Sequence, residues 1–455
     1  MKLFGTDGIR GDSSKFPFDD KTLFVIGKSA AETLKNSASK ILIIRDTRQS
    51  GKRIQKCLAE GILSAGVKTV FGGVMPTPAA SCLVRKGNYC AAIVISASHN
   101  PYNDNGIKIF DSRGSKLADA VEAEIESGIQ KHLANCCAAP RPDKSKTKIK
   151  ENASLLKDYE KFIIKAAGAG CKNSLKGRTV VIDCANGASY KCAPEILEKL
   201  GVKVIVLNAK PDGKNINLNC GALHPQHAAE TVKKKKAFCG FAFDGDADRL
   251  ICIDENGEIR DGDFFLSSMA KYLKKNKKLK NNILVATVMA NTGFFKAMKE
   301  AGIKTVASKV GDRYVLEDMR KYKASLGGEQ SGHFIFGDIL QTGDGILSAV
   351  QLLEALNAEN KTLSEFVSGV EKYPQILINK KVSEKVPLEK LPGSRKLIES
   401  FKKELSGDGQ MLVRYSGTEN LLRVMVEGKD KNRIREIAEK TADFIYGEIN
   451  DKTGR

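Results

Sequence analysis

The sequence predicts an α/β fold of three similar domains, followed by a smaller α+β domain at the C-terminal end. A strand–helix–strand pattern occurs three times along the chain, and in each repeat a further strand leads into an unusual polar loop. The remainder after about residue 370 has short strand patterns and one long terminal helix instead. With roughly 150 residues per domain as a guide, 455 residues suit three or four domains.

Three apolar segments that open the repeats predict buried strands, and they span residues 41–44, 179–182 and 283–286. Each leads into a polar turn and then into a helical stretch, which ends near a glycine at position 66, 201 or 302. A glycine suits a helix C-terminus, and the β-branched residues that follow it predict a second strand. Such strand–helix–strand units favour parallel pairing with a right-handed crossover.

A third strand in each repeat ends at a loop with chemically active side chains. Residues 91–95 lead to SASHNP, residues 238–243 to DGDADR, and residues 324–326 to GGEQSGH. Ligands of open α/β sheets bind beyond the carboxyl ends of the strands. If the three domains face one cleft, the three loops therefore meet in it.

The fourth domain differs from the repeats, with a predicted strand over residues 421–426 and a helix over residues 431–449. We expect the domain boundaries to divide the chain into residues 1–150, 151–255, 256–369 and 370–455. Hydrophobic residues at 42% and charged residues at 28% suit a globular chain of this kind.

Composition also bears on where the protein works. No apolar run approaches the roughly 18 residues that predict a membrane span. Charged residues occupy the N-terminal segment, where a signal peptide needs an apolar stretch. The eleven cysteines are scattered and form no C-x-x-C pair, which predicts free thiols. We therefore expect a cytoplasmic protein that does not interact with a membrane.

The formal charge of +20 raises the possibility of a nucleic-acid partner. No zinc-finger, helix-turn-helix or aromatic RNA-binding pattern accompanies this charge. We therefore expect no nucleic-acid partner, and a basic excess also suits a cleft that binds anionic small molecules.

Ser98 follows the predicted strand at residues 91–95 and is the candidate phosphoryl carrier of the first loop. A serine at this point can be exposed and held rigidly, with His99 as a neighbouring proton carrier and Lys108 as a fixed positive charge. A serine hydroxyl is a weak nucleophile unless it is activated, whereas a phosphoserine stores a phosphoryl group ready for transfer. The alternative is that the polar residues of this loop only satisfy a turn.

Asp244, Asp246 and Asp248 alternate directly after the apolar segment FCGFAF. Three carboxylates so close together repel one another unless a cation lies between them. Hard oxygen ligands favour Mg²⁺ or Ca²⁺ over zinc, and octahedral Mg²⁺ would keep positions open for a phosphate oxygen and water. The sequence therefore predicts one Mg²⁺ per chain, with Arg249 placed to neutralise phosphate beside it. An EF-hand is excluded, because Arg249 stands where that loop needs glycine.

Two further loops carry groups that suit a phosphosugar. Glu329, Ser331 and His333 alternate within GGEQSGHF, and the alternation predicts that they point one way, towards sugar hydroxyls or an amine. The segment RYSGTENLLR combines guanidiniums, hydroxyls and loop amides into a phosphate cradle, with candidate ligands Arg414, Ser416, Gly417, Thr418 and Arg423. The alternatives are a plain surface turn for the first loop and a hairpin turn with incidental charge for the second.

Together these loops, from FGTDGIRG at the start to RYSGTE near the end, resemble the α-D-phosphohexomutase superfamily over essentially the whole chain. FGTDGIRG, SASHNP with NDNGIK, DGDADR, KVGDRYV and GGEQSGH are similar to the branch that acts on glucosamine phosphate. Gln330 and Asp312 stand where the glucose and mannose mutases usually carry methionine and histidine. Asn420 departs from the family, which usually has proline there. The resemblance implies mixed sheets in the three α/β domains and four domains around a central active-site cleft.

The resemblance also implies a role for each matching residue. Ser98 would be the phosphoserine of the first domain, and its phosphate would bind Mg²⁺ together with the three aspartates of the second. Glu329, Ser331 and His333 of the third domain would contact the sugar, and the ligands within residues 414–423 would hold the phosphate that does not react. The reaction centre would be lined by Arg10, His99, Lys108 and Arg249.

The implied activity is that of an isomerase, an intramolecular phosphotransferase. Phospho-Ser98 would phosphorylate glucosamine 6-phosphate, and glucosamine 1,6-bisphosphate would form as intermediate and activator. The bisphosphate would turn end for end and rephosphorylate Ser98, and glucosamine 1-phosphate would leave to feed UDP-N-acetylglucosamine synthesis. The alternatives are a phosphomannomutase or phosphoglucomutase of the same superfamily, and a catalytically silent sugar-phosphate-binding protein. We expect a monomer or a homodimer.

Overall fold

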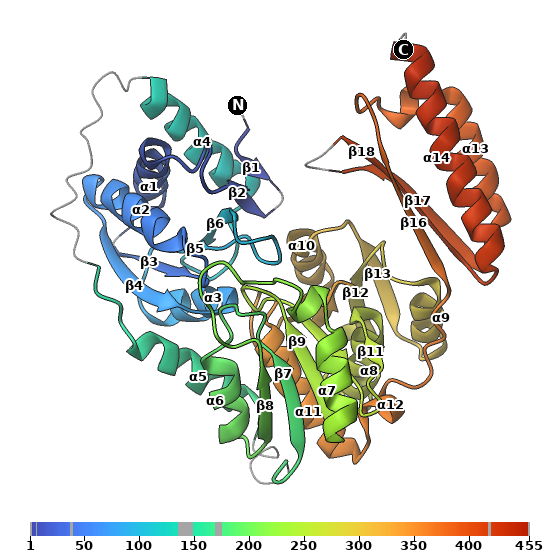
Figure 1. Ribbon diagram of the computed structural model, residues 1–455, viewed down its shortest axis with the longest axis horizontal. Helices are drawn as coiled ribbons and strands as arrows, with labels where there is room; N and C mark the ends of the chain where they lie inside the picture. The colour runs from blue at the N-terminus through green and yellow to red at the C-terminus, as the bar shows by residue number, and fades with distance from the viewer. Residues whose placement is uncertain are drawn as a thin grey trace. The chain divides into compact units, whose positions relative to one another are not determined.

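The computed structural model describes residues 2–5, 7–36, 40–134, 149–168, 175–416 and 420–453 of the chain. The chain forms two compact units, of which the first comprises Met1–Met289 with Ile303–Ser368 and the second Ala290–Gly302 with Gly369–Arg455. Figure 1 follows the elements along the chain from blue to red. Helices alternate with strands throughout the first unit, which is the predicted α/β pattern.

The first sheet contains the first repeat. Its strands β4, β3 and β5 are parallel neighbours, and β6, β2 and β1 continue the sheet beyond β5 as antiparallel strands. The aliphatic runs of β3 and β5 are buried, as strands covered on both faces require. The strands of this sheet are β1 (Phe4–Gly5), β2 (Gly8–Asp12), β3 (Lys40–Arg45), β4 (Lys68–Val74), β5 (Ala91–Ile95) and β6 (Asp104–Asp111).

The same strand order returns in the second and third sheets. The order is β8-β7-β9-β10 in the second and β13-β12-β14-β15 in the third, with three parallel strands followed by an antiparallel one in each, and β11 extends the second sheet beyond β10 by a further antiparallel pairing. This order confirms the predicted class of three similar α/β domains with mixed sheets. The strands are β7 (Thr179–Asp183), β8 (Lys203–Leu207), β9 (Cys239–Phe243), β10 (Leu250–Ile253), the edge strand β11 (Ile259–Arg260), β12 (Ile283–Thr287), β13 (Lys304–Ser308), β14 (Leu326–Gly328) and β15 (Phe334–Phe336).

One predicted strand is displaced along the chain. Residues 324–326 were expected to be extended, but β14 begins only at Leu326. The amide of Ala324 donates to the carbonyl of Met319 at 2.8 Å, so it still closes the end of the preceding helix. The strand therefore brings Gly327 and Gly328 into the sheet, and the polar loop starts at Glu329.

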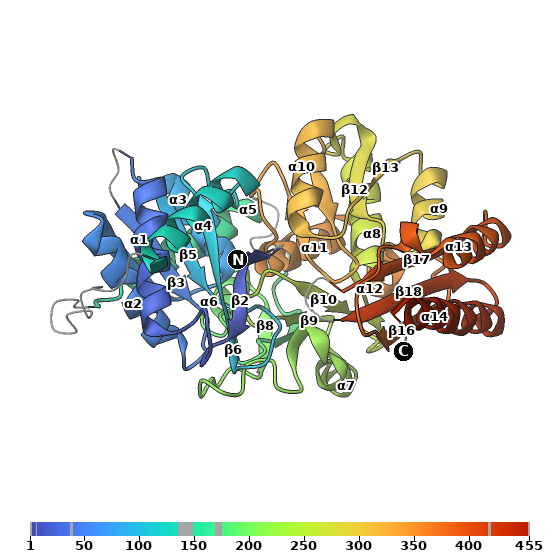
Figure 2. The ribbon, with the colours of Figure 1, turned by 90° about the horizontal axis from the view of Figure 1, so that it is seen from above.

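Helices cover both faces of the first sheet (Figures 1 and 2). Helices α1, α2 and α4 share a core with alternate residues of the strands, while α3 packs on the other face with α5. α1 and α2 cross closely, because a Cβ at Gly27 would lie 2.2 Å from the Leu58 carbonyl oxygen and one at Gly61 2.0 Å from that of Phe24. The helices are α1 (Asp20–Leu34), α2 (Gly51–Ser64), α3 (Thr77–Lys86), α4 (Asp119–Ala134) and α5 (Ser154–Ala166).

Three helices in the rest of the first unit begin with a side-chain cap. Asp261 and Asp344 accept hydrogen bonds from the first amides of α8 and α11, and Thr362 forms a capping box with Glu365 at α12. α7 packs against β7 and β9 (Figure 1). These helices are α6 (Cys192–Lys199), α7 (Gln226–Lys235), α8 (Gly262–Lys275), α10 (Asp312–Tyr322), α11 (Gly345–Glu359) and α12 (Leu363–Phe366), with short 3₁₀ turns at Gly221–Leu223 and Lys280–Asn282.

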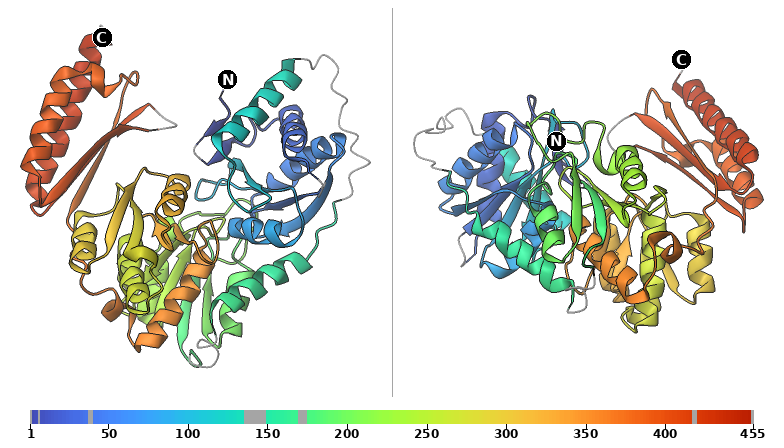
Figure 3. Two further views of the ribbon diagram at one scale, coloured as in Figure 1. Left: turned by 180° about the vertical axis from the view of Figure 1, so that it is seen from behind. Right: turned by 60° about the horizontal axis from the view of Figure 1, so that its bottom comes forward.

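The second unit has its own core. A three-stranded antiparallel sheet in the order β16-β18-β17 packs against α14, and α13 packs beside α14. The two long helices lie together on one face of this sheet (Figures 1 and 3). The elements are α9 (Thr292–Glu300), β16 (Gln375–Lys381), a 3₁₀ turn at Leu388–Lys390, α13 (Pro392–Glu404), β17 (Gly409–Tyr415), β18 (Leu421–Gly428) and α14 (Lys431–Thr453). The Gly369–Arg455 part of this unit has the predicted α+β architecture, and the unit also includes Ala290–Gly302 with α9, which was expected in the third domain.

Among the described residues, no helix is both long enough and apolar enough to cross a membrane. Eight of the cysteines are described as free and buried thiols. The four domain boundaries and the central cleft stay predictions.

Candidate active site

Ser98 stands at the turn after β5, and its side chain is only 1% exposed. This differs from the exposed serine that we predicted, because the aspartate loop of the second domain covers it. The Ser98 hydroxyl donates to Oδ2 of Asp244 at 2.5 Å and lies 3.3 Å from Nδ1 of His99. The backbone of Ser98 is left-handed, with φ at 52°, and its amide donates to the Ser96 hydroxyl at 3.0 Å. The serine is thus held against a carboxylate from another domain.

Asp244, Asp246 and Asp248 form one buried cluster beyond the end of β9. Each offers a carboxylate oxygen, and these oxygens all lie within 4.8 Å of one another. In the part of the chain that the structure describes, Oδ1 of Asp246 and Oδ1 of Asp248 have no hydrogen-bond partner. Burial and the two neighbouring carboxylates hold the pKa of Asp244 well above its usual value. Buried oxygens without donors and mutually repelling carboxylates fit a hard divalent cation.

Lys108 supplies part of the charge that balances this cluster. Its ammonium lies 2.9 Å from Oδ2 of Asp246, 3.2 Å from Oδ2 of Asp248 and 3.2 Å from Oδ2 of Asp7. Burial alone would lower the pKa of Lys108, but the three carboxylates hold it well above its usual value. Burial alone would raise the pKa of Asp248. The neighbouring cations, of which Lys108 has the largest effect, instead lower this pKa to about 2.

Thr77 is a contact of the cluster that the sequence did not indicate. Its amide donates to the carbonyl of Asp246 at 2.9 Å, and its hydroxyl donates to Oδ2 of Asp246 at 2.5 Å. Thr77 begins α3 of the first domain, 169 positions away from Asp246. No pattern around Thr77 distinguishes it from any other helix start.

Asp7 and Lys116 were also missed, and they link the first domain to the third. Lys116 forms ion pairs with both Asp7 and Asp312, while Asp7 also pairs with Arg10. Burial would raise the pKa of Asp7, but Lys108, Lys116 and Arg10 hold it well below its usual value. The predicted residue Arg10 therefore lies beside the cluster, and its guanidinium donates to the carbonyl of Ala97 at 3.4 Å.

His99 and Arg249 lie next to the serine and the aspartates. Burial, Arg249 and Arg10 lower the pKa of His99 to about 4. The amide of Arg249 donates to Oδ1 of Asp244 at 3.2 Å, and its backbone forms a β-bridge with His333. Both residues therefore lie beside Ser98 and the aspartate cluster, and their place at a reaction centre stays a prediction.

The predicted sugar-binding loop joins β14 to β15, and its predicted residues differ in burial and in conformation. Residues 329–332 form a turn, closed by the amide of Gly332 donating to the carbonyl of Glu329 at 3.0 Å, so the strand-like alternation expected here is wrong. His333 is buried and Ser331 is exposed. In the described part of the chain neither ring nitrogen of His333 has a hydrogen-bond partner, although Nε2 lies 3.4 Å from Oδ2 of Asp312.

Two other polar side chains of this region, those of Glu329 and Gln330, each form a hydrogen bond. Glu329 accepts from the amide of Gly311 at 3.2 Å, and burial raises the pKa of Glu329. The side-chain amide of Gln330 donates through Nε2 to Oδ2 of Asp263 at 3.1 Å. The carboxylate of Glu329 and the side-chain amide of Gln330 are therefore each held in place by a hydrogen bond.

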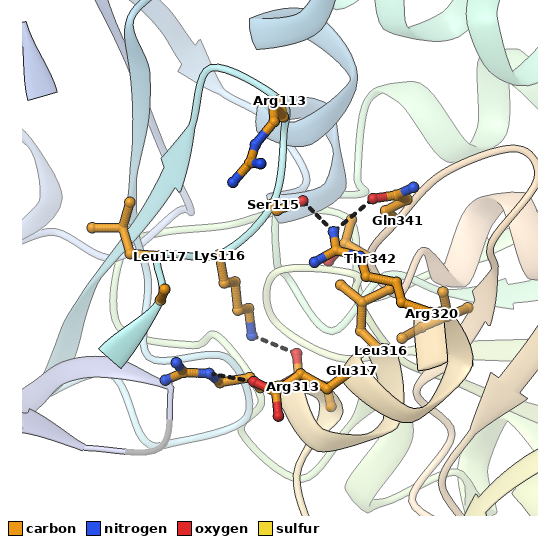
Figure 4. A pocket seen from close by; sticks show the side chains of 13 residues that line it. Arg113, Ser115, Lys116, Leu117, Arg313, Leu316, Glu317, Arg320, Gln341 and Thr342 are labelled. Atoms are coloured by element: carbon orange, nitrogen blue, oxygen red, sulfur yellow. Dashed lines mark hydrogen bonds and ion pairs between the residues drawn. The ribbon is translucent and has the colours of Figure 1, made fainter. Parts of the chain in front are cut away.

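A cavity of about 100 Å³ adjoins this region, between the loop after β6 and helix α10. Lys116 and Asp312 belong to its lining. In Figure 4, Arg320 lies between Ser115 and Gln341, and its guanidinium donates to each at 2.6 Å. The cavity wall is thus a second polar link between the first and third domains.

In the second unit, two of the predicted phosphate ligands face each other across a ladder. Arg414 on β17 is paired in register with Arg423 on β18. Burial and the neighbouring Arg423 lower the pKa of Arg414, as expected for like charges held together. Ser416 is buried and follows β17. Gly417 and Thr418 lie outside the described residues.

Family models match the chain in four consecutive segments. They are described as phosphoglucomutase/phosphomannomutase alpha/beta/alpha domain I (residues 1–135), domain II (157–257), domain III (261–373) and the C-terminal domain (377–444). Together these segments cover most of the chain. The residues of the cluster described above fall within the first three.

Curated relatives match over nearly the full length. Phosphoglucosamine mutase of Protochlamydia amoebophila is 44% identical over 451 residues, which cover 99% of this chain and 98% of the relative. Phosphoglucosamine mutase of Clostridium acetobutylicum is 43% identical over 454 residues, which cover 99% and 100%.

Solved structures share the fold at lower identity. A phosphoglucomutase/phosphomannomutase family protein from Burkholderia thailandensis has a TM-score of 0.77 at 23% identity, covering 98% of this chain and 97% of that one. N-acetylphosphoglucosamine mutase of Aspergillus fumigatus, in complex with GlcNAc-6P and magnesium, has a TM-score of 0.66 at 16% identity, with coverage of 99% and 96%. These solved structures share the fold, and the four family models with the full-length relatives show that the chain belongs to the phosphoglucomutase/phosphomannomutase family and, within it, to the phosphoglucosamine mutases.

Proposed function

We propose that this chain is a phosphoserine-dependent isomerase that interconverts glucosamine 6-phosphate and glucosamine 1-phosphate. The observation that carries the proposal is the contact between the Ser98 hydroxyl and Asp244 at 2.5 Å, within a buried cluster of three aspartates. A hydroxyl held against a candidate cation site can carry a phosphoryl group that the cation neutralises. The alternative of a turn that only satisfies its own polar residues does not account for the bond from the Ser98 hydroxyl to a buried carboxylate of another domain.

Asp244, Asp246 and Asp248, with a phosphate on Ser98, would hold Mg²⁺. Bound there, Mg²⁺ would neutralise charge on the transferring phosphoryl group. Relatives in this fold include one whose structure was determined with magnesium. Magnesium suits the all-oxygen donor set of the cluster.

The reaction consists of two transfers in opposite directions. In the first, the bond between phosphorus and Ser98 Oγ breaks, and a bond forms to the free hydroxyl of glucosamine 6-phosphate. The resulting 1,6-bisphosphate turns end for end, and its 6-phosphoryl group returns to Ser98 while glucosamine 1-phosphate leaves. The net change is an isomerisation, so no phosphate is consumed.

The residues around Ser98 divide into charged groups and proton carriers. Lys108 and Arg249 face the cluster as cations and would stabilise negative charge that develops on the phosphoryl oxygens. The sugar hydroxyl must lose a proton as it attacks, and Ser98 must regain one when it is not phosphorylated. The candidates are His99, which lies 3.3 Å from the Ser98 hydroxyl, His333, whose ring nitrogens form no hydrogen bond among the described residues, and Lys108.

The sugar and its other phosphate would be bound by separate loops. Glu329, Ser331 and His333 would contact the sugar, and a carboxylate there suits the amine of glucosamine. Arg414 and Arg423, with Ser416, Gly417 and Thr418, would hold the phosphate that does not react. An anion would relieve the repulsion between the two paired guanidiniums.

Substrate choice rests on the same region. Gln330 is held by Asp263, and Asp312 pairs with Lys116, so both positions that differ from the glucose and mannose mutases are structured here. We infer that a phosphoglucomutase or phosphomannomutase activity is secondary. We further propose a cytoplasmic monomer or homodimer, with a phosphosugar rather than nucleic acid or a membrane as its partner, whose product feeds UDP-N-acetylglucosamine synthesis.

A coupled assay of glucosamine 1-phosphate formation tests the proposal. The purified chain is supplied with glucosamine 6-phosphate, Mg²⁺ and glucosamine 1,6-bisphosphate as activator. We expect turnover that needs both Mg²⁺ and the bisphosphate and that exceeds turnover on glucose 6-phosphate and mannose 6-phosphate. Faster turnover on either of those sugars would refute the substrate assignment, and no turnover on any would refute the mutase.

A further inference from the structure

The backbone carbonyls of Ser98 and Asn100 are both bound by the same two side chains, one from each of two domains. We propose that these side chains, Arg48 and Asn217, are positioning residues that fix the phosphoryl-carrying loop against the metal loop. The inference rests on the proposed role of Ser98 as phosphoryl carrier. Neither residue was indicated by the sequence.

Arg48 lies within the first domain, after β3, and its side chain is fully buried. Its Nη2 donates to the carbonyl of Ser98 at 3.1 Å and to that of Asn100 at 2.6 Å. Its Nη1 pairs with the buried carboxylate of Asp46 and lies 3.5 Å from the hydroxyl of Ser96. The guanidinium is therefore fixed on one side by a carboxylate and presents its other side to the serine loop.

Asn217 approaches the same two carbonyls from the second domain. Its Nδ2 donates to the carbonyl of Ser98 at 2.9 Å and to that of Asn100 at 3.1 Å. Its own amide donates to the carbonyl of Ala185 at 2.9 Å, which anchors it beyond the end of β7. Its backbone is left-handed, with φ at 59°, a conformation that asparagine tolerates better than most residues.

The metal loop closes over the same contact. A Cβ added at Gly245 would lie 2.6 Å from the Ser98 carbonyl oxygen and 2.7 Å from Nδ2 of Asn217. Gly245 stands between Asp244 and Asp246, two of the proposed magnesium ligands. The side chain of Asn217 therefore lies against both the serine loop and the metal loop.

This arrangement matters because phosphoryl transfer depends on position. The Ser98 backbone has a conformation that L residues rarely adopt, and its carbonyl bonds oppose relaxation of the turn. A displacement of about 1 Å at a reacting group can cost about 100-fold in rate. Since neither Arg48 nor Asn217 is proposed to touch the sugar, loss of the clamp should appear in kcat rather than in KM.

The test uses substitutions in the loop that carries Asn217. Asn217→Ala removes the amide, and Asn217→Asp keeps its size but turns a carboxylate towards two carbonyl oxygens. Asn215→Ala is the matched control, because Asn215 is also half-buried and its amide bonds only within the loop, to Lys210 and Asp212. Arg48→Lys keeps the charge but removes the fork that reaches both carbonyls.

We expect Asn217→Ala to lower kcat about 10- to 100-fold in both directions, with KM for the hexose phosphate within about threefold of the parent. Asn217→Asp should lose at least as much, Arg48→Lys should lower kcat in the same way, and Asn215→Ala should stay within about threefold. Single-turnover transfer from phospho-Ser98 should slow by the same factor as kcat.

Parent-like kcat in Asn217→Ala, or an equal loss in Asn215→Ala, would overturn the proposal. So would a loss that appears only in KM. If Asn217→Ala does not fold, Asn217→Asp and Arg48→Lys decide by the same criteria. Each variant is compared with the parent on whichever hexose phosphate the parent turns over, so failure of the substrate assignment stays distinguishable from failure of the clamp.

Discussion

Replacing Lys116 with methionine should destabilise the first unit and make the loss depend on pH. The Lys116 ammonium bridges Asp7 and Asp312, and the side chains of all three are at least three-quarters buried. Lys116→Met keeps much of the apolar stem and removes the charge that the two carboxylates share. The third domain and the N-terminal segment would then face each other through two buried anions.

After the substitution, the two carboxylates keep different cationic partners. Asp7 keeps Lys108 and Arg10, whereas Asp312 keeps only His333 at 3.4 Å among the ion pairs of the described residues. Breaking a buried ion pair from one side costs about 3–5 kcal/mol. Because Asp7 stays compensated, we expect a loss near the lower end, about 3 kcal/mol in the free energy of unfolding at pH 7.

The sign of the pH dependence follows from the two carboxyl groups. Burial would raise both pKa values, but Lys116 and the other cations hold the pKa of Asp312 below and that of Asp7 well below its usual value. A carboxyl group with a depressed pKa stabilises the fold above its unfolded pKa, and the contribution is lost as pH falls through its folded pKa. The difference between parent and variant should therefore be full at pH 7 and shrink below about pH 4, near the unfolded value.

Urea unfolding of parent and Lys116→Met at pH 7 and at about pH 3, below the unfolded pKa of the two carboxyl groups, measures this difference. Lys15→Met is the control, because its pairing with Asp12 is solvent-exposed and should contribute little to stability. A difference in unfolding free energy below about 1 kcal/mol at pH 7 would show that solvent screens the ion pairs of Lys116 with Asp7 and Asp312. A gap that stays constant between the two pH values would refute the assignment of the loss to the two carboxylates.

Three further substitutions test other parts of the account. Asp246→Asn should lower turnover by several orders of magnitude and shift the Mg²⁺ titration, because it removes one of three clustered carboxylates; superimposable titration curves would rule out the metal site. Arg414→Ala should lower kcat/KM about 10- to 100-fold, mainly through KM, if it and Arg423 bind phosphate in ground and transition states alike; unchanged affinity for glucosamine 6-phosphate would make the pair structural. Tyr159→Phe should cost about 1–3 kcal/mol in stability, since the buried Tyr159 hydroxyl donates to Asp344 at 2.9 Å; thermal unfolding like the parent's would show that this bond contributes nothing net.

Local patterns predicted the parts of the fold that depend on nearby residues. Buried strands such as β3 and β9 are runs of aliphatic or aromatic residues, and the glycines after the helices mark the turns into the second strands. The three aspartates were recognisable because alternating carboxylates after an apolar strand have few other uses. The turn at residues 329–332 was not, since Gly332 breaks an alternation that reads as a strand.

Contacts between domains were not predictable from the same patterns. Thr77 meets Asp246 across 169 positions, and Lys116 meets Asp312 across 196. Each is an ordinary polar residue in its own segment, and only the packing of the first domain against the second and third gives it a role. The burial of Ser98 has the same origin, because a residue at a strand end is exposed until another domain covers it.

The central claim is that Ser98 carries the phosphoryl group, and the direct measurement follows that group. The purified chain is phosphorylated with labelled hexose 1,6-bisphosphate, the labelled peptide is identified by mass spectrometry, and the protein is then mixed with glucosamine 6-phosphate in a single turnover. The account predicts one phosphate on Ser98 that moves to the sugar at a rate no slower than kcat. It also predicts that Ser98→Ala, with an unchanged circular dichroism spectrum, takes up no label and turns over no substrate. Label on another residue, or near-parental turnover in Ser98→Ala, would contradict it.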